Sequence, residues 1–290
     1  MGGDARPAVG QEQHVPDRPG GDQPAGSDDQ RRDNRPRLAD GRPGPDWLAE
    51  PRGLRPAVAV ATLRNRARMA QSADRLVQGI LDTVGDDTYV VLTSDNGFHL
   101  GQLGLSLGKG TPYSPDVQVP LLVVGPGVPA GARGELATNL DLAPTLEDLA
   151  GLTPAPFRSG ASLVPSLRDP KAQRRAYVFH EHSRPAPSAA DPDHTAELGV
   201  IPSYVAVRSR TRLLARFDLA SIRDRAAGTR YVYELYDLTR DRFERTNVYG
   251  RPRYADDVAV LRARLRAFDA CTDVAGNDQV RGACRRLDQP

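Results

Sequence analysis

The chain of 290 residues has two cysteines, two lysines and few aromatic residues, which make up 6% of the sequence. No apolar run reaches the roughly 18 residues that a membrane-spanning helix needs. The first 20 residues also lack the apolar core of a secretory signal, so we expect no export signal in this chain. These shortages exclude a helical membrane span and leave the cellular location open.

Charge of one sign is also lacking, because 39 basic and 37 acidic residues leave a net charge of +2. The two signs are interspersed along the chain, which argues against a nucleic-acid groove or a polybasic membrane patch. Nearly all of the basic residues are arginine, as in proteins from GC-rich genes. We therefore expect no nucleic-acid partner, and the composition does not indicate an oligomeric state.

The two cysteines, Cys271 and Cys284, both lie in the polar tail over residues 271–290. They would close a short loop as a disulfide in an oxidising compartment, or stand as two free surface thiols. The sequence leaves both alternatives open.

Residues 1–58 are rich in Gly, Pro, Asp, Arg and Gln and show neither a helical nor a strand period. They hold too little apolar surface to offset the entropy lost on ordering. The segment is interpreted as a disordered leader or as a stretch read out of frame from a GC-rich gene.

Residues 59–175 alternate strands and helices, which predicts an α/β layer architecture. Apolar residues from Met69 to Val84 recur at helical spacing, and Gly85 follows as the expected C-cap of a helix packed on a sheet. The apolar runs Tyr89–Thr93 and Val119–Val124 predict two short strands covered on both faces.

Asp141 is expected to cap a helix that continues to Leu149 and stops at Gly151. Residues 176–270 then read as a small antiparallel sheet closed by an amphipathic helix over Ala255–Phe268. The four expected strands are Tyr177–Phe179, Tyr204–Val207, Leu213–Phe217 and Tyr231–Tyr236.

The chemistry is concentrated after the first predicted strand, in Asp95, Asn96, His99 and Lys109. A carboxylate and an amide oxygen suit Ca²⁺ or Mg²⁺ better than zinc, and Lys109 between two glycines can bind a sulfuryl or phosphoryl oxygen. Each signal alone has a simpler interpretation: a turn at Asp95-Asn96, a solvated lysine, and an exposed loop histidine without a role. Further on, His180 and His182 alternate along a strand as a possible ligand or as polar surface.

Together these residues resemble the sulfatase family of the alkaline-phosphatase-like superfamily. The resemblance covers residues 60–270 and rests on six segments in the order typical of that family: TSDNGFHLGQLGLSLGKGTPY, VPLLVVGPGVPAG, TNLDLAPTLEDLAGL, SGASLVPSL, IPSYVAVRSRTRLL and YELYDLTRDRFERTNV. It implies the C-terminal part of an alkaline-phosphatase-like α/β/α sandwich, followed by the small sheet and a C-terminal helix. The implied activity is hydrolysis of a sulfate ester, either a small molecule or a glycan.

The resemblance implies that Asp95 and Asn96 are ligands of a divalent cation, usually Ca²⁺, and that Lys109 contacts the sulfate. The resemblance supports a role of His99 as a catalytic acid or base only weakly. Asn96 favours single-cation sulfate chemistry, because related two-zinc enzymes that act on phosphate tend to carry a histidine there.

The chain departs from the family at the nucleophile. Sulfatases use a formylglycine made from the cysteine of a C-x-P-S-R or C-x-A-S-R motif, whereas Cys271 begins CTDVA and Cys284 begins CRRLD. The first metal-binding aspartate pair of the family is also missing, so we expect the chain to be inactive alone. The alternatives are a phosphodiesterase or phosphonate hydrolase of the same superfamily, and a non-catalytic binding remnant.

Overall fold

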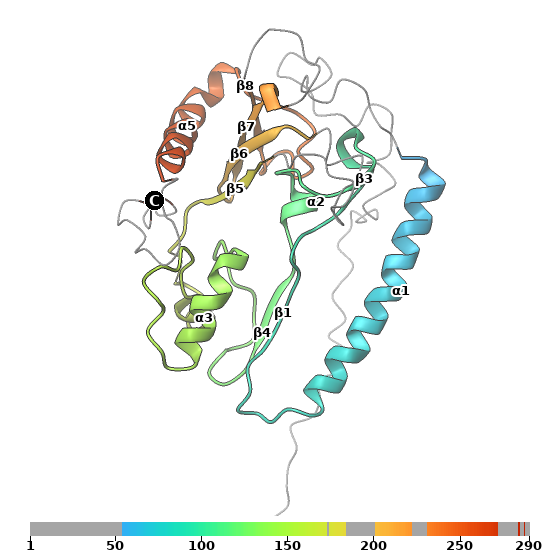
Figure 1. Cartoon of the computed structure of the whole chain (residues 1–290), viewed down its shortest axis with the longest axis vertical. Coiled ribbons are helices and arrows are strands. Elements are labelled where there is room, and N and C mark those ends of the chain that lie inside the picture. Colours follow the sequence, from blue (N-terminus) through green and yellow to red (C-terminus); the bar gives the residue numbers. More distant parts are fainter. Residues whose placement is uncertain are drawn as a thin grey trace, which may run out of the picture.

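The computed structural model describes residues 54–172, 174–183, 201–221 and 231–271, together with residues 284 and 287. The helices are α1 (Pro56–Leu81), α2 (Ser114–Val117), α3 (Leu142–Leu149), α4 (Val164–Arg168) and α5 (Ala255–Asp269). The strands are β1 (Val90–Thr93), β2 (His99–Leu100), β3 (Leu107–Gly108), β4 (Leu121–Val124), β5 (Val178–His182), β6 (Ser203–Arg208), β7 (Arg212–Asp218) and β8 (Tyr231–Asp237). Figure 1 shows β1 and β4 in the lower half, the sheet of β5 to β8 with helix α5 in the upper half, and α1 running along the right side.

Strands β5, β6, β7 and β8 form one antiparallel sheet in that order, which confirms the small sheet that the sequence predicts. Alternate residues of a strand point to opposite faces. Tyr204 and Ala206 of β6 belong to a buried cluster with Leu103 and Tyr113 of the loop between β2 and α2. One face of the small sheet therefore packs on the loop that carries the candidate site.

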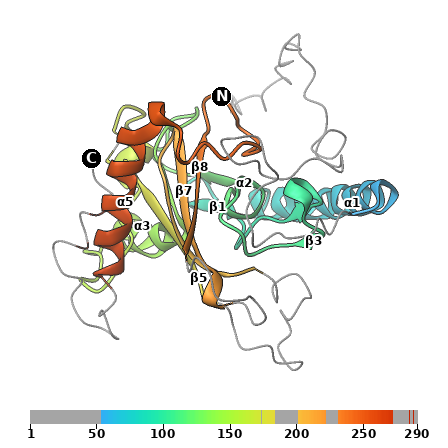
Figure 2. The ribbon, with the colours of Figure 1, turned by 90° about the horizontal axis from the view of Figure 1, so that it is seen from above.

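The opposite face of the sheet is covered by α5, as Figure 2 shows. Leu261 and Leu265, four residues apart on this helix, are buried against Val207 of β6. Phe268 stacks on Phe179 of β5 with the ring centroids 4.8 Å apart. The amphipathic closing helix is thus confirmed.

Strands β1 and β4 are an antiparallel pair, with Val90 opposite Val124 and Thr93 opposite Leu121. The expectation that both faces are covered is wrong for the described residues, because the side chain of Leu122 is 54% exposed and that of Val124 is 51% exposed. The reason is that this sheet has two strands, so each strand has a single neighbour and no further layer covers the pair.

Helix α1 differs from the sequence expectation in its bounds and in its packing. It begins at Pro56, earlier than the apolar period at Met69, and its C-cap is Asp82 rather than Gly85. Met69 is 71% exposed and Leu76 is 66% exposed, so the apolar stripe does not pack on a sheet as predicted. Figures 1 and 2 show that α1 runs apart from the four-stranded sheet. A helical period fixes which side chains share a face, whereas the partner of that face is a non-local property.

The start of α3 corrects the expectation for Asp141. Its side chain gives no cap bond to α3; instead it closes a capping box with Thr138 around the preceding 3₁₀ turn, Asn139–Asp141. The predicted stop at Gly151 is confirmed, because α3 ends at Leu149 and Gly151 takes a positive φ of 76°.

The described Cys271 and Cys284 are joined by a disulfide with their Cα atoms 5.8 Å apart, which decides between the two alternatives left open by the sequence. Within the described ranges, no helix is both long and apolar enough to cross a membrane.

Candidate functional site

The candidate site begins where β1 ends, at Ser94-Asp95-Asn96-Gly97. Gly97 permits a close approach, because an added Cβ would lie 2.0 Å from the carbonyl oxygen of Pro115. The N–H of Gly97 donates to the carbonyl oxygen of Asp116 at 2.7 Å, and the N–H of Phe98 donates to that of Pro115 at 2.8 Å. These bonds hold the segment after Asn96 against α2.

The Asp95 carboxylate is exposed and accepts a hydrogen bond from the Ser94 hydroxyl at 3.2 Å. The backbone N–H of Asn96 lowers the pKa of Asp95, with smaller contributions from the Ser94 hydroxyl and the charge of Lys109. The Asn139 side chain donates to the carbonyl oxygens of Ser94 and Asp95 at 3.1 and 3.0 Å. Asp95 is therefore ionised at neutral pH, on a backbone that is held by the 3₁₀ turn Asn139–Asp141 preceding α3.

Lys109 follows the hairpin of β2 and β3, in which His99 pairs with Gly108. Its ammonium group donates to Oδ1 of Asn96 at 3.3 Å. Three of the four predicted site residues are thus brought together although 13 positions separate Asn96 from Lys109. The arrangement places a carboxylate, an amide oxygen and a point cation at one end of β1.

His99 is buried, at 1% exposure, which corrects the alternative of an exposed loop histidine. Its Nδ1 lies 2.8 and 2.9 Å from the two carboxylate oxygens of Asp116. Oδ2 of Asp116 also accepts from the backbone N–H of Thr111 at 2.9 Å and from its hydroxyl at 2.6 Å. Because an ionised carboxylate only accepts, Nδ1 of His99 carries the hydrogen. Nε2 of His99 is buried and has no hydrogen-bond partner among the residues that the structure describes.

Asp116 is a site residue that the sequence reasoning missed. It lies 17 positions after His99, at a spacing typical of no motif, and it reads as an exposed acid before a short apolar run. A buried aspartate that orients a histidine ring is the arrangement used to fix which nitrogen carries the proton. The only sequence signal is the turn-forming Ser-Pro-Asp that brings Asp116 back to the hairpin.

An Asp116→Asn variant is expected to change the tautomer of His99. The amide offers one acceptor, which the Thr111 donors can occupy, and turns its NH₂ group toward Nδ1, so the ring hydrogen moves to Nε2. Imidazole ¹⁵N NMR measures this shift directly. The control is Asp148→Asn on α3, which alters a carboxylate that accepts a hydrogen bond from Ser162. It is expected to leave the His99 signals unchanged. A His99 tautomer that stays Nδ1–H in Asp116→Asn would contradict this role of Asp116.

The donor set fits a hard divalent cation in kind but is incomplete in number. Asp95 and Asn96 supply oxygen ligands of the type that Ca²⁺ and Mg²⁺ prefer. Among the described residues, however, no group of three or more His, Cys, Asp or Glu side chains is placed to hold a metal ion. Further oxygen ligands must come from outside this set.

His180 and His182 of β5 lie on the strand as predicted, opposite Ala206 and Tyr204 of β6. Burial, with a smaller effect of the Arg208 charge, lowers the pKa of His180 to about 4, and burial also lowers the pKa of His182. Both are therefore neutral at pH 7, and within the described part of the chain they do not join Asp95 in a group of three or more His, Cys, Asp or Glu side chains that could hold a metal.

Buried hydrogen bonds join the site loop to the small sheet. The hydroxyl of Tyr113 donates to Glu234 of β8 at 2.8 Å. The backbone N–H and hydroxyl of Ser114 donate to Glu244 at 2.8 and 2.9 Å, and Arg208 of β6 pairs with the same carboxylate. The small sheet therefore supports the segment that carries Lys109 and Asp116.

The structure combines helices and short strands with an appended four-stranded antiparallel sheet. The Sulfatase family model matches residues 11–152. The match begins inside the segment 1–58, for which we expected a leader; residues 1–53 lie outside the described residues, so that expectation and the proposed domain limits stay predictions.

Curated relatives agree with the family match. The extracellular sulfatase SULF-1 homolog of Drosophila melanogaster is 41% identical over 111 residues, which are 36% of this chain and 10% of that protein. The N-acetylglucosamine-6-sulfatase of Homo sapiens is 32% identical over 211 residues, 64% of this chain and 37% of the relative. The choline-sulfatase of Rhizobium meliloti is 31% identical over 220 residues, 68% and 36% of the two chains.

Solved structures agree in fold. A 2-O GAG sulfatase superposes with a TM-score of 0.60 at 23% identity, covering 81% of this chain and 49% of that one. The chain is similar to sulfatases over the residues matched, and its alkaline-phosphatase-like α/β fold with an appended small sheet is confirmed. The chain spans well under half the length of the curated relatives it matches.

Proposed function

We propose that the chain provides the cation-binding and sulfate-contacting part of a site that hydrolyses sulfate esters. The observation that carries the proposal is the 3.3 Å contact between Lys109 and Asn96 beside the exposed, ionised Asp95. A hard cation at the two oxygen donors and the ammonium group would flank one sulfuryl group from two sides. Electrostatic stabilisation of this type is usually the largest single contribution to catalysis of group transfer.

Each residue has a distinct role in this proposal. Asp95 and Asn96 hold a divalent cation, Ca²⁺ by family resemblance, which would polarise a sulfate oxygen when bound. Lys109 stabilises the negative charge on the sulfuryl oxygens or the leaving oxygen. His99, held by Asp116 at Nδ1, leaves Nε2 to accept or return a proton.

None of the four residues given a role above supplies the nucleophile. Both cysteines of the sequence are engaged in the Cys271–Cys284 disulfide, so neither is a thiol that can become a formylglycine. Sulfatases generally use that group, which supplies the attacking oxygen. We therefore expect no turnover of an aryl sulfate by this chain alone.

The proposal is tested by transferring residues 88–128 into a complete N-acetylglucosamine-6-sulfatase in place of its matching segment. Sulfatase activity in a folded chimera supports the proposed role of this segment. A chimera that folds and binds its cation but hydrolyses no sulfate ester contradicts it.

Calcium is expected to stabilise the chain alone only slightly. Asp95 and Asn96 supply two of the six or more oxygens that Ca²⁺ prefers, so affinity is low and linkage adds little to the free energy of unfolding. A thermal melt with and without about 1 mM Ca²⁺ measures this, since a ligand at its own Kd adds only about 0.4 kcal/mol. A rise of several degrees that Asp95→Ala removes would show a more complete site than we infer.

A further inference from the structure

One face of the β1–β4 pair is apolar and open. Leu92 of β1 lies opposite Leu122 of β4. Two positions along, Val90 lies opposite Val124. Residues that are opposite each other in an antiparallel pair share a face, and so do residues two positions apart on one strand, so these four side chains point the same way. Leu92, Leu122 and Val124 are exposed. Within the described part of the chain, nothing covers this face.

Helix α1 presents a second open apolar surface, on the side that is turned toward the site segment. The guanidinium carbon of Arg66 lies 4.7 Å from the centroid of the Phe98 ring, just beyond β1. Ile80 follows Arg66 after about four helical turns, and Leu76 lies about one turn before Ile80. Both are exposed. Figure 1 shows α1 running alongside the β1–β4 pair. The apolar stripe of α1 therefore lies near the open strands without packing on them.

The charge of α1 argues against a second copy of this chain as the occupant. The helix carries four arginines and one aspartate: Arg64, Arg66, Arg68, Arg75 and Asp74. Two copies that paired along this helix would bring like charges together, which is unfavourable. A partner with carboxylates at the edge of its apolar surface would complement these arginines.

The comparison with solved structures indicates what kind of partner fits. The 2-O GAG sulfatase superposes on 81% of this chain but only on 49% of its own length. A protein of this fold thus carries about as much chain again beside the part that matches. Layered architectures bury each apolar sheet face against another element, and a sheet of two strands is at best marginally stable in water. The open faces of β1–β4 and α1 are surfaces of the kind that such further chain would cover.

The open strands also adjoin the incomplete cation site. Asp95 follows the last residue of β1, Thr93, by two positions. Asp95 and Asn96 supply only two of the six or more oxygens that Ca²⁺ prefers. A polypeptide that covers β1 would lie next to Asp95, where its own oxygen atoms could add to the ligand set.

We propose that the open face of β1–β4 and the apolar stripe of α1 form a docking surface for a separate polypeptide. That partner carries the part of a sulfatase-like domain that precedes the residues matched here. It covers Leu92, Leu122 and Val124, and it packs on Leu76 and Ile80. The inference rests on the proposed function in that a partner bound here adds ligands to the site at Asp95.

The test mixes the full chain with one probe, the part of the Rhizobium meliloti choline-sulfatase that precedes its matched segment. The probe is first shown to reassemble with that enzyme's own matched segment, so that it is known to be competent. Light scattering is expected to show a 1:1 complex. Hydrogen exchange is expected to slow at the amides of β1 and β4, because the partner protects the open strands.

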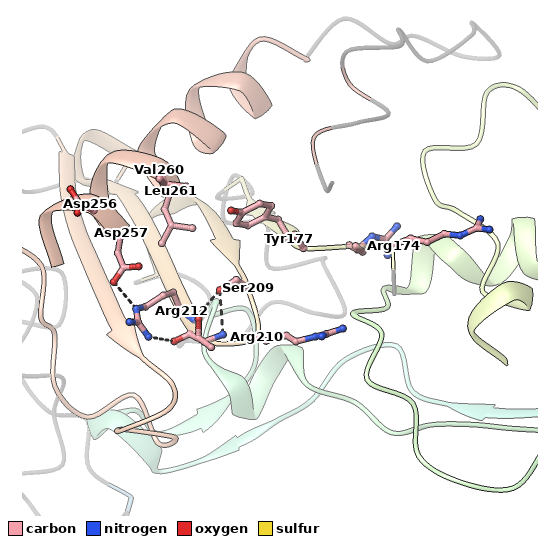
Figure 3. Close-up of a pocket in the computed structure, with 12 residues that line it drawn as sticks. Arg174, Tyr177, Ser209, Arg210, Arg212, Asp256, Asp257, Val260 and Leu261 are labelled. Carbon is pink, nitrogen blue, oxygen red and sulfur yellow. Dashed lines mark hydrogen bonds and ion pairs between the residues drawn. The ribbon is translucent and has the colours of Figure 1, made fainter. Parts of the chain in front are cut away.

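Two pairs of substitutions make the result specific. Leu76→Arg combined with Leu122→Arg should weaken the complex about tenfold or more, because each places a charge in an apolar contact. Both side chains are exposed, so the free variant stays folded. The control is Phe243→Arg combined with Val260→Arg, at side chains that are 46% and 49% exposed. Val260 lies on α5 in the wall of the pocket shown in Figure 3, which neither Leu76 nor Leu122 lines. This control should bind as the unaltered chain does.

The proposal is overturned if the competent probe forms no complex, if the control loses as much affinity, or if the surface variant loses none. A dimer of this chain that excludes the probe and is abolished by the surface variant would assign the surface to a second copy instead. The proposed function fails separately. A complex formed by a chain whose chimera is inactive leaves the docking surface standing, whereas an active chimera with no complex contradicts the docking surface alone.

Discussion

Lys109→Ala in the chimera that carries residues 88–128 is expected to lower kcat for a sulfate ester about 10²–10³-fold, as loss of one preorganised electrostatic contact does. The ammonium group lies against Asn96, so its removal takes away the only lysine of the transferred segment and the charge that faces the bound sulfuryl group. Steady-state kinetics at saturating substrate measure the effect.

Two variants make this result specific. Gln118→Ala, an exposed residue of the same segment, should leave kcat unchanged. Lys109→Arg should recover only part of the rate, because a planar guanidinium is larger than an ammonium group and donates along different directions. Retention of most of the activity in Lys109→Ala would refute the sulfate-contact role.

Asp141→Ala is expected to destabilise the chain by about 3–5 kcal/mol, the usual cost of leaving one partner of a buried ion pair alone. Asp141 is fully buried, and its carboxylate accepts from Arg175, from the N–H of Thr138 at 2.7 Å and from the N–H of Ala161 at 2.8 Å. The substitution therefore strands a buried guanidinium and two backbone donors. Urea unfolding followed by circular dichroism measures the change in the free energy of unfolding.

The comparison that isolates the charge is the double variant Asp141→Ala with Arg175→Met. It removes the stranded cation and should recover part of the lost stability, while the two backbone donors stay unpaired. Asp148→Ala, on α3, removes a carboxylate that accepts from the Ser162 hydroxyl, and should cost about 1 kcal/mol. Equal losses for Asp141→Ala and Asp148→Ala would contradict the buried-pair account.

Periodic patterns predicted the small sheet and its covering helix well. The short apolar run Tyr204–Val207 and the helical spacing of Leu261 and Leu265 are local properties, and the structure forms the strand and buries the two leucines as expected. The same reasoning correctly predicted an apolar stripe on α1, but it wrongly predicted that this stripe packs on a sheet. Met69 and Leu76 are exposed because no described segment packs on them.

For the candidate site, the sequence predicted which residues could bind a cation or an anion, and the structure added Asp116 as the partner of His99. Asp95, Asn96 and Lys109 were predicted from the end of a strand and a glycine-flanked cation, and Lys109 lies against Asn96. Asp116 was not predicted, because its importance comes from the fold of the hairpin that brings it to His99. Their roles as metal ligands and sulfate contact stay predictions.

The amino-acid sequence by itself determined the similarity to sulfatases, the strand that delivers Asp95 and Asn96, and the antiparallel sheet at the C-terminal end. These follow from motifs and periods that neighbouring residues create. Only the tertiary structure decided that His99 is a buried, oriented imidazole, that Asp141 joins Arg175 rather than capping α3, and that Cys271 and Cys284 are bonded. Those features depend on burial and on contacts between distant residues, whose energies are set by desolvation and by partners that spacing alone does not encode.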